Sequence, residues 1–229
     1  MKTLDENAFL SLVKGGTVVT INGGGVSVVL TKDNRYIKIF RPPSRFSSDF
    51  FSPRPLRFEK AVRSLEARNI HTVLDLEMYW VPCMKRHVAY YTPLPGKELR
   101  TAIGDTQNPD SLISGFAQFL ADIHRQGIYF RGINFSNVLL CTDGQYGLID
   151  VGSVQTHKQS LGADLRARNF KHPLAYLQDK DAIERFGIIK LVKSYLEAAA
   201  LDQQETVKFL KKLAGQHKLF AKCMPDIEK

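Results

Sequence analysis

Residues 127–152, GIYFRGINFSNVLLCTDGQYGLIDVG, contain the pattern that decides the fold. Asn137 stands before a short apolar run, and Asp143 with Gly144 supplies the turn chemistry of a β-hairpin. A second apolar run leads to Asp150, where a Val-Gly step permits a sharp bend. The sequence therefore predicts a hairpin whose strands bring the side chains of Asn137 and Asp150 to one edge of a small sheet.

Two oxygen-bearing side chains at one sheet edge suit a divalent cation. Mg²⁺ prefers a few hard oxygen ligands and shares the rest of its coordination shell with water and phosphate. Asn137 and Asp150 are therefore the candidate metal ligands.

The same stretch resembles the protein-kinase superfamily. Residues 130–137, FRGINFSN, align with the catalytic loop H-R-D-L-x-x-x-N, and residues 150–152, DVG, align with D-F-G. The resemblance implies that Asn137 and Asp150 hold Mg²⁺ beside ATP. Gly132 stands where the family has its catalytic aspartate, so the sequence departs from the pattern at the position that matters most for activity.

Length and composition indicate a folded protein of one large or two small domains. The chain has 229 residues, of which 44% are hydrophobic. No apolar run approaches the roughly 18 residues that span a bilayer, and the first residues lack the order of a signal peptide, so we expect a cytoplasmic protein. The three cysteines have no metal-type spacing and are expected to be reduced packing residues: Cys83, Cys141 and Cys223.

The net charge of +9 is concentrated in one region. Residues 31–68 contain ten Lys or Arg and four Asp or Glu, an excess of six. Such a region attracts anions, and the alternatives are a solvated surface, a phosphorylated substrate or an anionic membrane face. No motif indicates nucleic acid, and we expect none as a partner. The sequence leaves a protein partner open and does not identify the oligomeric state.

The amino-terminal part is predicted to be a short amphipathic helix within residues 1–14 followed by a sheet. The strands are recognised by β-branched and aromatic residues between turn signals. Five strands are predicted, at residues 17–21, 26–31, 36–40, 71–76 and 88–92.

A glycine-rich turn and a lysine on a strand follow the order found in kinases. Gly23, Gly24 and Gly25 lie between the first two strands, where backbone amides could approach a phosphate; an ordinary hairpin loop is the alternative. Strand alternation places Lys38 on the face opposite Ile37. The resemblance implies that Lys38 holds the nucleotide phosphates.

A helix is predicted over residues 56–68, after a connector at residues 41–55 whose prolines prevent helix formation. Glu59 lies beside the apolar face of this helix and is the candidate partner of Lys38. Glu66 is the rival candidate. The alternative for either glutamate is a weak surface pair within an arginine-rich helix.

Residues 93–97 contain Pro-Leu-Pro-Gly and are predicted to be a hinge between two lobes, residues 1–92 and 98–229. In the kinase resemblance this hinge would contact adenine. The predicted fold is accordingly α+β, with a five-stranded sheet and one helix in the first lobe and a short, mainly helical second lobe.

The second lobe is predicted to begin with a core helix that starts near residue 108 and ends at Gly127. His124, in its last turn, is expected to brace the following loop, and a catalytic base is the less favoured alternative. Residues 153–173 are predicted to be irregular. Two further helices are expected at residues 180–200 and 203–214, the second with a capping box of Asp202 and Glu205.

The catalytic-loop stretch and the RARNFKH segment at 166–172 resemble bacterial lipopolysaccharide-core sugar kinases, including toluene-tolerance proteins. This resemblance implies transfer of the γ-phosphoryl group of ATP to a heptose or related sugar of a lipid-linked core oligosaccharide. The acceptor would be anionic and would lie at the inner face of the cytoplasmic membrane. Arg131 would support the loop or a nearby phosphate.

Gly132 cannot replace the missing aspartate, because it has no side chain to accept a proton. General-base assistance is worth roughly two to four orders of magnitude in rate. Asn134 could orient a hydroxyl but cannot act as a base. Positioning and electrostatics carry most of phosphoryl transfer, so an active kinase remains one hypothesis. A nucleotide-binding pseudokinase that regulates or scaffolds envelope biogenesis is the second, and a basic membrane adaptor without nucleotide is the third.

Overall fold

The computed structural model describes residues 2–22, 25–42 and 52–227. The chain divides into two compact units, Met1–Pro95 (unit 1) and Gly96–Lys229 (unit 2). The predicted hinge, residues 93–97, spans this division in the sequence.

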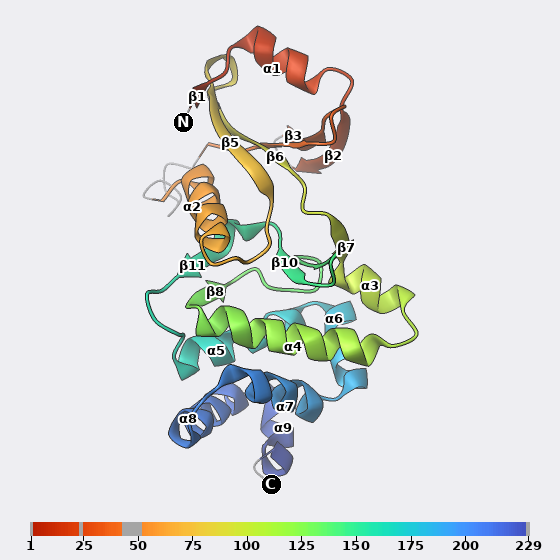
Figure 1. The fold of residues 1–229 in the computed structure, drawn as a ribbon, viewed down its shortest axis with the longest axis vertical. Helices are drawn as coiled ribbons and strands as arrows, with labels where there is room; N and C mark the ends of the chain where they lie inside the picture. The colour runs from red at the N-terminus through yellow and green to blue at the C-terminus, as the bar shows by residue number, and fades with distance from the viewer. Residues whose placement is uncertain (1, 23–24, 43–51, 228–229) are drawn as a thin grey trace. The chain divides into compact units, whose positions relative to one another are not determined.

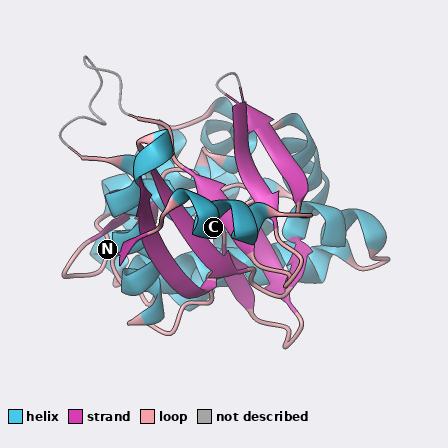
Figure 2. Cartoon of the chain, turned by 90° about the horizontal axis from the view of Figure 1, so that it is seen from above, coloured by secondary structure: helices cyan, strands magenta, loops and turns pink. Residues whose placement is uncertain are grey.

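Unit 1 contains a six-stranded sheet of order β1-β5-β6-β4-β3-β2 (Figure 1). All neighbouring strands are antiparallel except β1 and β5, which are parallel. The strands are β1 Lys2–Thr3, β2 Thr17–Asn22, β3 Gly25–Leu30, β4 Tyr36–Ile39, β5 Leu74–Val81 and β6 Arg86–Thr92 (magenta in Figure 2).

The sheet differs from the five predicted strands in two places. The sixth strand, β1, comes from residues that were predicted to be part of a helix, and it pairs through Lys2 and Thr3 with Tyr79 and Trp80. The strand predicted at residues 71–76 runs instead over Leu74–Val81. The second half of the observed strand pairs with β6 and buries Val81.

One helix covers each face of this sheet. Helix α1, Glu6–Val13, begins at Asp5, whose Oδ1 accepts the Ala8 N–H at 2.8 Å. Its Phe9 packs in an apolar cluster with Ile37 and Tyr90. Helix α2, Arg54–Glu66, packs on the other face, where the ring of Phe58 lies against Phe40 and Tyr91.

Helix α2 begins two residues earlier than predicted. Pro55 lies in its first turn, where the missing N–H of proline has no helical partner to lose. From the sequence, Pro55 was predicted to belong to a connector that its prolines keep from being helical. In the first turn of a helix, however, proline is tolerated. Most of the predicted connector, residues 43–51, lies outside the described residues.

Unit 2 contains two small sheets and most of the helices (Figure 1). The first sheet has the order β10-β9-β7 and includes the predicted hairpin; the second pairs β11 with β8. The strands are β7 Gly96–Glu98, β8 Ile128–Phe130, β9 Val138–Cys141, β10 Tyr146–Leu148 and β11 Val154–Thr156. The helices are α3 Leu99–Asp105, α4 Pro109–Arg125, α5 Ala163–Phe170, α6 Leu177–Phe186, α7 Ile188–Ala199, α8 Gln203–Ala214 and α9 Lys218–Ile227.

The carboxyl-terminal predictions were right for some helices and wrong for others. The capping box of Asp202 and Glu205 is present at the start of α8. The single helix predicted at residues 180–200 is two helices, because Gly187 has φ of 104° and interrupts the helical backbone. The segment predicted to be irregular contains β11 and α5.

Across the described part of the chain, none of the helices has both the length and the apolar character needed to cross a bilayer.

Candidate functional site

The predicted metal ligands lie at one end of the β9–β10 hairpin. Leu148 pairs with Val138, and the Ile149 N–H donates to the Asn137 carbonyl at 3.0 Å. Asp150 follows directly, is exposed, and has left-handed backbone angles, φ 52° and ψ 40°. Such a conformation costs about 1–3 kcal/mol for a residue other than glycine and is concentrated at functional sites.

Asn137 is oriented by the loop that precedes it. Its Nδ2 donates to the Gly132 carbonyl at 2.7 Å. Within the described residues its Oδ1 makes no hydrogen bond, so this oxygen remains available to a ligand. The Oδ1 of Asn137 and the carboxylate of Asp150 are hard oxygen donors, and this pair fits Mg²⁺ when water and phosphate complete the shell.

Asn134 has a structural position in the same loop. Its side chain is only 4% exposed, and its Nδ2 donates to the Gly132 carbonyl at 3.1 Å. Its Oδ1 accepts the N–H groups of Ser136 at 2.8 Å and Asn137 at 3.2 Å. Because both ends of the amide are engaged, the geometry favours a role in folding the loop over the predicted role in orienting a hydroxyl.

Gly132 is packed closely on the side where a Cβ would stand. A Cβ there would lie 2.9 Å from Ser153 Oγ and 3.0 Å from Phe130 Cε2. The position therefore has a hydroxyl beside it in place of the carboxylate of the kinase pattern. Arg131, the preceding residue, is exposed. The pKa of His172 is lowered first by burial of the histidine, then by the charge of Lys171 and last by the charge of Arg131.

The candidate phosphate-binding residues belong to unit 1. Lys38 lies between Val28 and Ala89 across the sheet, with its ammonium group 5.1 Å from the Phe58 ring centroid. It is therefore on the α2 face, opposite Ile37, as strand alternation predicted. Gly25 has φ of 104°, and Gly23 and Gly24 lie outside the described residues.

The structure pairs Glu59 with a different cation from the one predicted. The Nη2 and Nε of Arg63 donate to Glu59 Oε1 at 2.8 and 3.2 Å, one helical turn along α2. Glu66, the rival candidate, is exposed and lines an open pocket of about 550 Å³ in unit 1, together with Arg35 and Arg63. The i,i+4 spacing of Glu59 and Arg63 was the sequence signal for this pairing.

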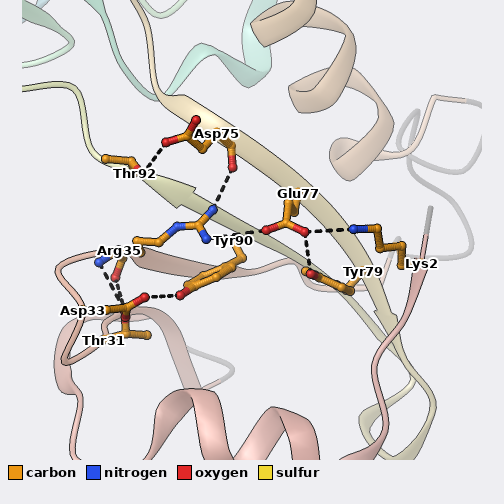
Figure 3. A network of polar contacts seen from close by, with 9 residues as sticks. All are labelled: Lys2, Thr31, Asp33, Arg35, Asp75, Glu77, Tyr79, Tyr90 and Thr92. Atoms are coloured by element: carbon orange, nitrogen blue, oxygen red, sulfur yellow. Dashed lines mark hydrogen bonds and ion pairs between the residues drawn. The ribbon is translucent and has the colours of Figure 1, made fainter.

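Arg35 is the centre of a polar network at the edge of this pocket (Figure 3). Its guanidinium lies 3.7 Å from the Tyr90 ring centroid, and Nη2 donates to the Asp75 carbonyl at 2.8 Å. Tyr90 donates its hydroxyl to Asp33, and hydrogen bonds from Thr31 and Tyr90 hold the pKa of Asp33 below its usual value. The network joins the turn before β4 to strands β5 and β6.

Glu77 extends the network to β1. It accepts the Tyr79 hydroxyl at 2.7 Å and the Lys2 ammonium at 3.1 Å. The pKa of Glu77 is lowered by these two contacts, more by the hydrogen bond from Tyr79 than by the one from Lys2. Burial raises the pKa of Tyr79 to about 12. The short strand β1 is thus attached to the sheet by its backbone and by this side-chain contact.

A second polar network lies in the interior of unit 2. His124 is fully buried, and its ring nitrogens contact the Tyr195 hydroxyl and Asn169 Oδ1, each at 2.9 Å. Burial and the charge of Arg166 lower the pKa of His124 to about 3, against the opposing effect of the hydrogen bond that its Nε2 donates to Asn169 Oδ1. Its backbone carbonyl accepts the Gly127 and Leu161 N–H groups. The backbone of His124, not its side chain, holds the following loop, so the ring does not cap helix-end carbonyls as predicted. A buried neutral ring is not placed to act as a base on a substrate.

Arg166 and Asn169 were not identified from the sequence. Arg166 is 1% exposed and donates to the Leu161 carbonyl, the Tyr195 hydroxyl and Ser160 Oγ at 2.6, 2.6 and 2.7 Å. Asn169 donates from Nδ2 to the Phe130 carbonyl at 2.9 Å, which connects the network to the strand before the candidate loop. The basic run at 166–172 gave no local signal that its first arginine is buried.

Other metal chemistry has no cluster to support it in the described ranges. There, no group of three or more His, Cys, Asp or Glu side chains could hold an ion. No disulfide joins Cys83, Cys141 and Cys223; Cys141 is buried, as expected of a packing residue, whereas Cys83 is exposed.

Comparison with known proteins gives no family assignment. No protein-family model matches the chain, and no curated protein matches it in sequence. Among solved structures, the bifunctional kinase-methyltransferase WbdD is similar, with 17% identity and a TM-score of 0.44, over 82% of this chain and 46% of the WbdD chain. This chain therefore spans less than half the length of that protein.

Proposed function

We propose that the chain binds ATP with Mg²⁺ and transfers the γ-phosphoryl group to a sugar hydroxyl of the lipopolysaccharide core. The observation that carries the metal assignment is the end of the β9–β10 hairpin. There, Asn137 has its amide oriented by the Gly132 carbonyl, and Asp150 occupies a strained, exposed turn.

Each side chain has a separate task in this proposal. Bound Mg²⁺ would neutralise charge on the phosphate oxygens. Asn137 Oδ1 and the Asp150 carboxylate would hold the ion, and the hydrogen bond from Asn137 Nδ2 to Gly132 would keep the amide oxygen facing outward. Arg131 is exposed and carries a charge that suits a phosphate or the loop carbonyls.

The assignments in unit 1 rest on the sequence resemblance. Lys38 and the glycine turn at residues 23–25 would hold nucleotide phosphates, and residues 93–97 would contact adenine. Glu59 would orient Lys38 only after exchanging its present partner, Arg63.

The acceptor class rests on charge and on the resemblance to core sugar kinases. A net charge of +9 favours an anionic, lipid-linked oligosaccharide or membrane surface over a neutral acceptor. We accordingly propose that the protein acts in the cytoplasm, at the periphery of the inner membrane face.

A pseudokinase is the second candidate, and the surroundings of Gly132 favour it. The nearest side-chain oxygen to a Cβ at this position is Ser153 Oγ, which is not a base at neutral pH. Loss of general-base assistance lowers rates by roughly two to four orders of magnitude. In this alternative the chain binds nucleotide and regulates or scaffolds envelope biogenesis.

Calorimetric titration of ATP with Mg²⁺ into the native chain tests both candidates. We expect binding that Asp150→Asn weakens at least tenfold, since even indirect partners of a metal ligand are worth about 10–100-fold in metal affinity. Asp143→Asn is the matched control, because Asp143 lies in the turn of the same hairpin and Asn can still accept the Gln145 N–H. No binding by the native chain, or equal effects of the two variants, would reject both nucleotide hypotheses and favour the adaptor.

Transfer of the γ-phosphate to purified core oligosaccharide then separates the two. Turnover by the native chain that Asp150→Asn abolishes identifies a kinase. Nucleotide binding without turnover identifies a pseudokinase, and in that case Gly132→Asp is combined with Ser153→Ala, which removes the close Oγ. A gain of turnover in this double variant would show that the aspartate is the missing group.

A further inference from the structure

A pocket of about 430 Å³ lies within unit 2, between α3, the start of α4 and α6. Its polar side includes Arg100 and Arg185, and its apolar side includes Ile113, Phe135 and Phe186. Phe135 belongs to the loop that carries Asn137, so one wall of the pocket is formed by that loop.

Arg100 is held in place by a buried carboxylate. Its Nε donates to Asp179 Oδ1 at 2.7 Å, and Asp179 is fully buried and also accepts the Phe135 N–H at 2.8 Å. One carboxylate therefore fixes both the arginine and the loop backbone.

One outer nitrogen of Arg100, Nη1, remains available. Within the described residues neither Nη1 nor Nη2 makes a hydrogen bond, and Nη2 is enclosed by protein. An oxygen of a phosphate or carboxylate in the pocket would accept a charge-assisted hydrogen bond from Nη1.

Arg185 supplies the second cation. Among the described residues its one hydrogen bond is from Nε to the Asp181 carbonyl at 3.2 Å, so its outer nitrogens are also available. Asp110, the acid that lines the pocket, forms an ion pair with Lys190 at 3.6 Å. Its charge is therefore partly compensated, and the pocket favours an anion.

The pocket has a substantial apolar wall, made by Ile103, Phe135 and Phe186 among others. Beside it, the ring of Tyr176, which is 44% exposed, lies with its centroid 5.6 Å from the Arg100 guanidinium. A simple inorganic anion would contact the arginines and leave this apolar surface uncovered. A ligand with a charged head and an apolar chain would satisfy both.

We propose that this pocket binds a phosphate monoester that carries an apolar chain. The phosphate is held between Arg100 and Arg185, and the chain lies along Ile103, Phe135 and Phe186. The ligand chemistry is shared by a soluble alkyl phosphate and by the headgroup of phosphatidic acid. The site uses none of the candidate metal ligands, so it does not depend on the proposed function.

The test is a calorimetric titration of the full chain, without nucleotide, by n-hexyl phosphate, inorganic phosphate and 1-hexanol. We expect n-hexyl phosphate to bind at least tenfold more tightly than either of the others. Arg185→Gln should weaken its binding roughly tenfold, through loss of a charge-assisted hydrogen bond. Arg168→Gln, an exposed arginine on α5 outside the pocket, is the control and should bind as the native chain does.

A second variant tests the apolar wall. Ile103→Ser should weaken the binding of n-hexyl phosphate several-fold and leave inorganic phosphate unchanged. Arg100→Gln is avoided because it would leave Asp179 buried without its cation. Equal affinities for n-hexyl phosphate and inorganic phosphate, or no effect of Arg185→Gln, would overturn the proposal.

Vesicles distinguish the two sources of the ligand. Phosphatidylcholine vesicles with phosphatidic acid should sediment the native chain more than pure phosphatidylcholine vesicles do, and Arg185→Gln should reduce the difference, if the ligand is a lipid headgroup. Binding of n-hexyl phosphate without binding to these vesicles assigns the pocket to a soluble ester. Binding of neither rejects it.

Discussion

Each unit builds a polar network around one arginine, and the two networks differ in burial and in charge. The Arg35 side chain of unit 1 is 21% exposed and lies 3.5 Å from the Glu77 carboxylate. Arg166 of unit 2 is 1% exposed, and the partners that the structure describes for it are a carbonyl and two hydroxyls. One arginine is thus neutralised at the surface, whereas the other is solvated by neutral oxygen atoms in the interior.

The difference follows from what burial requires of a charge. Water reaches part of the Arg35 side chain, although its Nε is enclosed and has no hydrogen-bond partner among the described residues, which carries a cost. Arg166 has no access to water, and it uses all three of its nitrogens in short hydrogen bonds. A buried charge tolerates little movement of its partners, so we expect the interior network to be the more rigid of the two.

Rigidity in unit 2 has a consequence for the candidate site. Tyr195 contacts both Arg166 and His124, and His124 contacts Asn169, which holds the Phe130 carbonyl. Phe130 ends the strand that leads into the loop with Gly132 and Asn137. The loop therefore rests on the buried network, while the Arg35 network joins the turn before β4 to strands β5 and β6 of the unit 1 sheet.

The largest expected effect comes from removing the buried arginine. Arg166→Ala leaves the Leu161 carbonyl and two hydroxyls without their donor and creates a cavity, which should lower the free energy of unfolding by about 3–5 kcal/mol. Arg168→Ala, two residues along α5 and exposed, should change it by less than about 0.5 kcal/mol. Urea denaturation measures both, and equal losses would show that Arg166 has no special role.

A smaller effect is expected from His124, and it depends on pH. The pKa of about 3 in the folded state lies below the ordinary value of 6.5, so the unfolded chain binds the proton first as pH falls. Stability should therefore decrease from pH 6.5 downward until the folded ring titrates near 3. For one such group the loss between pH 7 and pH 5 is up to about 2 kcal/mol.

His124→Gln isolates this contribution. The variant keeps a hydrogen-bonding side chain but cannot take up the proton, so its stability should fall less between pH 7 and pH 5 than that of the native chain. His87 and His172, whose pKa values burial also lowers, are present in both proteins and do not affect the difference. If both proteins lose the same stability over this range, His124 is not a buried neutral group.

Local patterns in the sequence predicted the elements that local chemistry determines. The β9–β10 hairpin follows from Asp143-Gly144 between two apolar runs, and the α8 capping box follows from Asp202 and Glu205. Lys38 lies on the face that alternation gave it. In each case the deciding residues are within a few positions of one another.

The sequence was least informative where distant segments decide the outcome. Strand β1 forms because Lys2 and Thr3 pair with Tyr79 and Trp80, far along the chain. Arg166 is buried because Tyr195, on another helix, provides an acceptor. Neither pairing has a periodicity that could reveal it.

The same distinction between local patterns and long-range contacts applies to the residues of the candidate site. The position of Asn137 and Asp150 at one end of the hairpin followed from the sequence, because the hairpin is local. The assignment of Asn134 to loop folding required its actual hydrogen bonds to Ser136 and Asn137. For Glu59, the i,i+4 spacing to Arg63 was readable, but a long-range ion pair with Lys38 was given more weight than this local one.

The smallest effect is expected in the surface network, and it sharpens the contrast with Arg166. Arg35→Gln removes the hydrogen bond to the Asp75 carbonyl and the contact with the Tyr90 ring, but water can solvate the groups that remain. We expect a loss of about 1 kcal/mol in the free energy of unfolding, and the ionic part of it should shrink in high salt. Arg41→Gln, an exposed arginine after β4, is the matched control and should change little. If Arg35→Gln were as damaging as Arg166→Ala, exposure would not be what separates the two networks, and Arg35 would have to hold the β5–β6 pairing as a whole.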